Sequence, residues 1–211
     1  MELYNIILGF HIAGGGAGLL AGTFVLLTKK GNDRHKLAGN FFHWGMMIAG
    51  LSALALSQMK PNPFLFMVAV FTLYMNYTGK RYLSFQNKQV KPEWLDHAVT
   101  LTMAAVSIVF ILKGNKLLKT DSFGWVYVAF GFLSIFMSIA DIRFAFQKER
   151  PAFAWLQYHL QRMIGTFIAS LTAVLVVNFT FEPAYALWLA PTVILTPLIM
   201  VWSRKYKNKR P

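Results

Sequence analysis

Apolar and polar stretches alternate along the whole chain, and each apolar run is roughly 20 residues long, enough to cross a membrane's hydrocarbon core as an α-helix. The seven runs are Leu3–Thr28, Lys36–Met59, Pro63–Ser84, Trp94–Leu112, Ser122–Phe146, Ala154–Phe179 and Ala184–Trp202. The pattern therefore predicts an all-α polytopic membrane protein with seven transmembrane helices, forming one domain over residues 1–211.

The composition is typical of a membrane protein and excludes chemistry that depends on cysteine. Hydrophobic residues make up 56% of the chain and charged residues only 14%, whereas about a quarter of a soluble domain is charged. The chain has no cysteine, which excludes disulfides, thiolate metal sites and cysteine nucleophiles. The first run has no basic segment before it and no clear cleavage site, so we expect a retained helix, not a signal peptide.

The basic residues are distributed unevenly between the polar segments. Most of the 21 Lys and Arg residues follow the first, third, fifth and seventh runs, and the opposite segments hold Lys60, Lys113, Lys116 and Lys119. The positive-inside rule then places the N-terminus outside and the C-terminus in the cytoplasm. We interpret the net charge of +13 as topology and contact with anionic lipid headgroups, not as nucleic-acid binding.

Three histidines recur at a constant interval. His35, His97 and His159 are 62 residues apart, and each stands where an apolar run begins. The spacing predicts three successive hairpins, of helices 1–2, 3–4 and 5–6, that close on the cytoplasmic side, followed by a seventh helix. Both an internal repeat and the ordinary length of a membrane hairpin are consistent with it.

A ridge of small residues follows one face of the first helix. Gly14, Gly18 and Gly22 are four residues apart, a spacing that lets a neighbouring helix approach closely. We expect His11, near this face, to point at another helix and away from lipid. The second helix carries Gly39 and Gly50 in a similar role.

Ionisable residues within the runs are the candidates for chemistry, because such groups are costly in a membrane. His43, His97 and His159 with Asp141 would form the shell of a zinc, iron or copper ion if their helices converge. Alternatively, His43 and His159 would be the axial ligands of a haem b, with Arg162 near its propionates.

Other interpretations of these residues stay open. Asp141 and the histidines could relay protons or coordinate the solute of a metal-free transporter or small-ligand-binding protein. In a purely structural role, Asp141 would pair with Arg143 or Arg162, and His43 and His159 would bind backbone groups or Tyr77. A homo-oligomer is equally compatible with the sequence.

Several separated motifs together resemble a family of prokaryotic predicted membrane proteins, domain-of-unknown-function family 2306. The resemblance implies a multi-pass protein of the bacterial inner membrane and brings no reaction or catalytic residues with it. It covers most of the chain through these positions: His11, Gly15 and Gly22; Lys30, Gly31, His35, Gly39 and Phe42; Thr78, Gly79, Lys80, Arg81 and Leu83; His159, Arg162 and Gly165.

Overall fold

The structure is a computed structural model of the chain, and it describes residues 1–207. This part of the chain is all-α with seven helices, as predicted. The helices are α1 (Glu2–Leu27), α2 (Asp33–Met59), α3 (Pro63–Arg81), α4 (Trp94–Leu117), α5 (Gly124–Phe146), α6 (Ala154–Asn178) and α7 (Ala184–Lys207), with the 3₁₀ helix η1 (Tyr82–Gln86) after α3.

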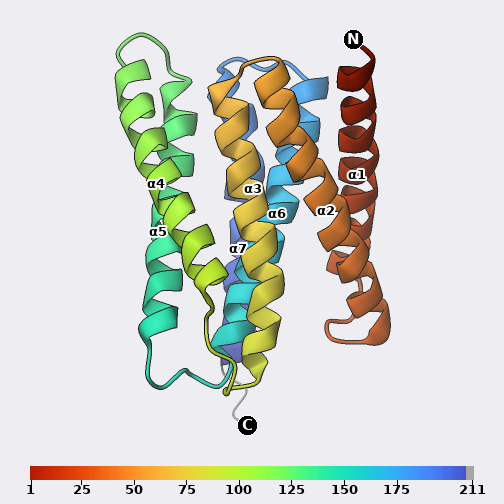
Figure 1. Cartoon of the computed structure of the whole chain (residues 1–211), viewed down its shortest axis with the longest axis vertical. Helices are drawn as coiled ribbons and strands as arrows, with labels where there is room; N and C mark the ends of the chain where they lie inside the picture. The colour runs from red at the N-terminus through yellow and green to blue at the C-terminus, as the bar shows by residue number, and fades with distance from the viewer. Residues whose placement is uncertain (208–211) are drawn as a thin grey trace.

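The helices run up and down between two ends of the molecule (Figure 1). The connections α1–α2, α3–α4 and α5–α6 lie at the lower end in this view, together with the C-terminal end of α7. These are the segments that carry most of the basic residues, so the charge asymmetry of the sequence becomes an asymmetry between the two ends. Which end faces the cytoplasm stays a prediction.

The pairing of the helices differs from the three predicted hairpins. The most extensive contacts join α1 to α2, α4 to α5 and α6 to α7, and α3 lies between α2 and α6. The first predicted hairpin is therefore confirmed as a packed pair, whereas α5 and α6 do not pack along each other and α3 contacts α4 less than it contacts α2 or α6. The connections over 82–93 and 147–153 are long enough to join helices that are not closely packed.

Five helices, α1, α4, α5, α6 and α7, are long and apolar enough to cross a membrane. Helices α2 and α3 are less apolar because their buried faces carry polar side chains, including His43 and Ser52 in α2 and Asn76 and Thr78 in α3. Many large apolar side chains of the other helices are exposed on the surface, as a lipid-facing surface requires: Leu20, Phe24, Leu101, Leu112, Phe136, Val177, Val193 and Ile194.

The predicted glycine ridge of α1 packs directly on α2. A Cβ at Gly45 of α2 would lie 2.8 Å from the carbonyl oxygen of Gly14 and 2.9 Å from the Cα of Gly18. His11, as predicted, points at the neighbouring helix, and its Nδ1 donates to the carbonyl of Ala49 at 2.9 Å. The two helices therefore approach at a distance that only glycine allows.

We expect Gly45→Ala to destabilise the protein, because the added methyl group meets backbone atoms that cannot rotate away. Overpacking of this kind costs about 1–3 kcal/mol, and the melting temperature of the detergent-solubilised protein should fall accordingly. Gly16→Ala is the matched control, since a Cβ there has nothing within 4 Å. Equal melting temperatures for the two variants would contradict close packing of α1 on α2.

Candidate functional site

A buried ion pair joins α5 to α6 in the half of the molecule nearer the basic end. An Nη2 proton of Arg162 is donated to Oδ1 of Asp141, and the exposed fractions of these residues are 1% and 7%. The same nitrogen also donates to the carbonyl of Met137 at 3.0 Å. For a purely structural role, the sequence allowed Asp141 to pair with Arg143 or Arg162. The structure has the pair with Arg162.

Two tyrosine hydroxyls complete the surroundings of the Asp141 carboxylate. Tyr74 of α3 donates to Oδ2, and Tyr82 of η1 donates to Oδ1 at 2.7 Å. Three donors from three different elements thus hold one carboxylate, and the network connects α3, η1, α5 and α6. Buried charges are tolerated in proteins when they are paired and hydrogen-bonded in this way.

The three histidines predicted to share a site occupy separate environments. His43 Nδ1 and Asn76 Oδ1 are 3.2 Å apart, and the Asn76 side chain donates back to the His43 carbonyl at 2.9 Å. His159 Nδ1 donates to the carbonyl of Gly79 at 2.7 Å. His97 lies in a pocket beside Asp141 that neither His43 nor His159 lines.

The geometry gives the metal and haem interpretations no support. Within residues 1–207, no three His, Cys, Asp or Glu side chains are placed to hold a metal ion. Paired axial histidines would need one shared cavity. His159 lines the larger cavity of the molecule, whereas His43 and Arg162 line neither of the two described below.

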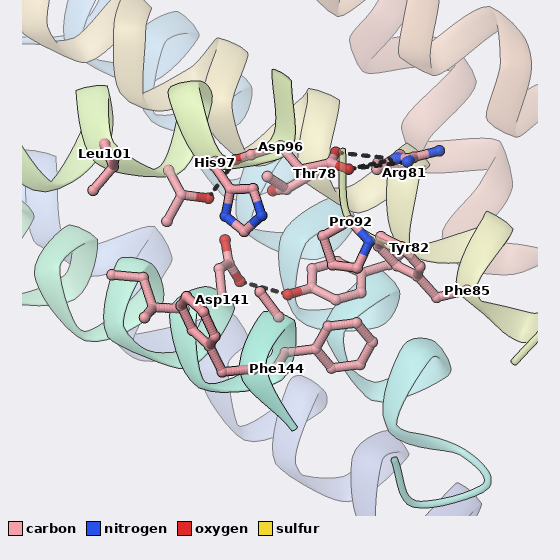
Figure 2. Close-up of a pocket in the computed structure, with 14 residues that line it drawn as sticks. Thr78, Arg81, Tyr82, Phe85, Pro92, Asp96, His97, Leu101, Asp141 and Phe144 are labelled. Atoms are coloured by element: carbon pink, nitrogen blue, oxygen red, sulfur yellow. Dashed lines mark hydrogen bonds and ion pairs between the residues drawn. The ribbon is translucent and has the colours of Figure 1, made fainter. Parts of the chain in front are cut away.

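The smaller of these cavities, about 350 Å³, lies between α3, α4 and α5 (Figure 2). His97 and Asp141 point toward each other across it, and Phe144 and Leu101 form part of its apolar wall. Its charged groups already have partners: Asp96 accepts from Arg81 at the rim, at 2.9 Å, and Asp141 accepts from Arg162. Little charge is left to attract a ligand.

The larger cavity, about 710 Å³, lies among α1, α2, α3, η1, α6 and α7, and we call it the basic cavity. Its walls combine cationic, aromatic and aliphatic side chains and include no Asp or Glu. They are formed by Gly22, Val25, Leu26, Lys30, Gly31, His35, Lys36, Gly39, Asn40, Phe42, Lys80, Leu83, Gln86, Trp155, Leu156, His159, Leu160, Met163, Ile164, Phe167 and Trp202.

Three lysines bring positive charge to this cavity. Lys80 donates to the Asn40 side chain, a bond that fixes the end of α3 against α2. Lys30 donates to the carbonyls of Val25 and Leu26 at the end of α1, at 2.8 and 2.7 Å, and its Nζ lies 4.4 Å from the ring centroid of Trp202. Lys36 is exposed and makes a loose ion pair with the equally exposed Asp33 at 3.7 Å. Lys36 and Lys80 therefore make fewer contacts with the protein than Lys30 does.

Two imidazoles supply further polar atoms to the walls. Because the Nδ1 of His159 donates to a carbonyl, its Nε2 is an acceptor in the neutral ring and a donor in the charged one. The Nδ1 of His35 is shielded from solvent and has no hydrogen-bond partner among the described residues. The positive charge at this end of the cavity comes from its lysines.

The opposite end of the basic cavity is apolar. Phe42 of α2 and Phe167 of α6 pack against each other at its floor, where a Cβ at Gly22 would lie 2.8 Å from Phe167 and 3.0 Å from Phe42. Trp155 and Trp202 stand near the ends of α6 and α7, at the basic end of the molecule. The cavity is therefore amphipathic, with a charged end and an apolar end.

This cavity is not predictable from the sequence, although several of its residues belong to sequence motifs. Lys30, His35, Gly39 and His159 belong to the motifs of the family resemblance, but only a three-dimensional arrangement of the helices shows that they share a wall. Comparison of the chain with protein-family models, with curated proteins and with solved structures finds no match. The function must be inferred from the geometry of the chain's own residues.

We expect Asp141→Asn to destabilise the protein strongly, because it leaves the Arg162 guanidinium buried without its carboxylate. Breaking a buried pair costs about 3–5 kcal/mol, which corresponds to a melting temperature lower by roughly 10 °C for a chain of this size. Asp33→Asn, at an exposed residue, is the control and should melt like the wild type.

The double variant Asp141→Leu/Arg162→Met distinguishes the stability cost of an unpaired buried charge from the cost of altered packing. It removes both charges and should melt above Asp141→Asn, because neither partner is then left unpaired. A double variant less stable than Asp141→Asn would show that the stabilisation does not come from charge pairing.

Proposed function

We propose that this protein is a small-ligand-binding membrane protein and that the basic cavity is its binding site. The observation that carries the proposal is a cavity of about 710 Å³ in which polar groups from several helices converge above an apolar floor. Ligand sites are typically concave, largely apolar cavities of about 300–1,000 Å³ with a few well-placed polar groups. The basic cavity has both the volume and the distribution of polar groups that such sites have.

The composition of the walls favours binding over catalysis. Among the residues that line the basic cavity there is no carboxylate, and no serine, threonine or tyrosine hydroxyl. The two histidines therefore have no nucleophile or acid beside them in the cavity wall with which to form a catalytic pair. The smaller cavity is a weaker candidate, because Asp96 and Asp141 in its wall already have cationic partners.

The proposal includes the full transmembrane topology. All seven helices cross the bilayer, and the positive-inside rule puts the N-terminus outside and the basic end in the cytoplasm. The membrane is the bacterial inner membrane, as the family resemblance implies. Five helices of sufficient length and apolarity support it, as does the gathering of the basic segments at one end (Figure 1). Trp155 and Trp202 then lie at the level of the inner-leaflet headgroups, where tryptophan is enriched.

Filling the cavity tests the proposal. A Cβ at Gly39 has nothing within 4 Å, so Gly39→Leu places a side chain in the free volume without a backbone clash. We expect native mass spectrometry of the wild type, incubated with a mixture of oleate, lysophosphatidate, lysophosphatidylcholine and monoolein, to show one retained molecule per chain. Gly39→Leu should lower that occupancy at least tenfold.

Gly16→Leu is the matched control, because Gly16 also has nothing within 4 Å and is exposed on α1, outside the cavity. It should retain the ligand like the wild type. Equal occupancy in all three proteins, or no retained molecule in the wild type, would refute the basic cavity as a binding site.

A further inference from the structure

The arrangement of groups along the basic cavity specifies the chemistry of its ligand. His35 and Phe42 are seven residues apart on α2, and His159 and Phe167 are eight apart on α6. At a rise of 1.5 Å per residue, about 10–12 Å separates the polar end from the apolar floor on both helices. The ligand that matches this profile has a polar head and an extended apolar part.

The sign of the charge is equally specific. Lys30, Lys36 and Lys80 line the cavity and no Asp or Glu does, so the head of the ligand should be an anion. Lys30 is largely engaged with the end of α1 and with Trp202. Lys36 and Lys80, one from α2 and one from the end of α3, are the cations best placed to bind an oxyanion.

An unsatisfied polar atom marks the same end of the cavity. Among the described residues, the shielded Nδ1 of His35 has no hydrogen-bond partner, although buried polar atoms normally have one. A neutral His159 ring cannot donate to an anion, because its Nδ1 proton is bound to the carbonyl of Gly79 and its Nε2 is then an acceptor. An oxyanion with two or three oxygens can accept from Lys36 and Lys80 at once.

The volume limits the apolar part. A cavity of about 710 Å³ is of the size that holds a single drug-sized molecule, and its floor closes at Phe42, Phe167 and Gly22. One acyl chain fits this space better than two. The tryptophans near the cavity, Trp155 and Trp202, are of the residue type that sits where such amphiphiles partition, between headgroups and hydrocarbon.

We infer that the basic cavity binds an anionic amphiphile with a single acyl chain. Lys36 and Lys80 hold its carboxylate or phosphate beside His35, and Phe42 and Phe167 contact its chain. This inference rests on the proposed function and specifies the ligand class of that site. The shared chemistry is an oxyanion on one acyl chain, which a free fatty acid and a lysophosphatidate both offer.

The experiment compares four probes by fluorescence-detected thermal shift and native mass spectrometry of the full-length protein. Oleate and lysophosphatidate are anionic, monoolein is the neutral counterpart, and inorganic phosphate is a head without a chain. We expect both anionic lipids to bind at least tenfold more tightly than monoolein, and the tighter of the two identifies the head. Inorganic phosphate should not bind measurably at the same concentrations.

Neutralising the two lysines tests their role. Lys36→Gln and Lys80→Gln should each weaken oleate binding about tenfold, as expected for the loss of one charge-assisted hydrogen bond, and should leave monoolein binding unchanged. Lys88→Gln is the control, because Lys88 is exposed beyond η1 and does not line the cavity. Unchanged monoolein binding also shows that each variant is folded.

The outcomes separate the inference from the proposed function. Monoolein binding as tightly as oleate, with both lysine variants unaffected, would overturn the anionic ligand while Gly39→Leu still identifies the cavity as a site. Inorganic phosphate binding as tightly as lysophosphatidate would overturn the acyl chain. Oleate binding that Gly39→Leu leaves intact would overturn both the ligand class and the site.

Discussion

A guanidinium that is almost fully buried must have its charge compensated inside the protein, and this requirement organises the centre of the structure. Arg162 meets it through Asp141 and the carbonyl of Met137, and Asp141 in turn accepts from Tyr74 and Tyr82. In surroundings of low dielectric constant, an unpaired ion would cost several kcal/mol. The relative positions of α3, η1, α5 and α6 therefore depend on one another through a single carboxylate.

The polar side chains on the buried faces of α2 and α3 also need partners inside the protein. Both helices carry side chains that would be unfavourable toward lipid, and these groups bond to each other, as His43 and Asn76 do. The more apolar helices α1 and α6 pack against this polar interior. The arrangement explains why two of the seven helices are less apolar than the other five.

Features that depend on local spacing could be predicted from the sequence. Seven helices follow from seven apolar runs, the α1–α2 contact follows from Gly14 and Gly18, and the pairing of Asp141 with Arg162 was one of two possible bridges. The place of His43, His97 and His159 along their helices was also predictable. The direction in which these three side chains face around the helix axis was not, because that depends on which helices are neighbours.

This dependence on neighbouring helices explains why the histidines do not form the predicted metal shell. It also explains why the basic cavity was not predicted. His43, His97 and His159 were predicted to share a site, yet they face Asn76, the smaller cavity and Gly79 respectively. The basic cavity draws its walls from segments as distant as Gly22 and Trp202. Nothing in the spacing of either segment indicates that the two would meet.

Helix α6 contributes to the basic cavity and to the ion-pair network. His159 lines the cavity, and Arg162, one turn further on, is fixed in the network. A shift of α6 that widened the cavity would have to stretch charge-assisted bonds to Asp141, so this wall is stiff. The wall on the far side, where Lys30 rests on the ring of Trp202, is joined by a contact worth only about 0.5–2 kcal/mol. The side of the basic cavity between α1 and α7 is therefore held less firmly than the side formed by α6.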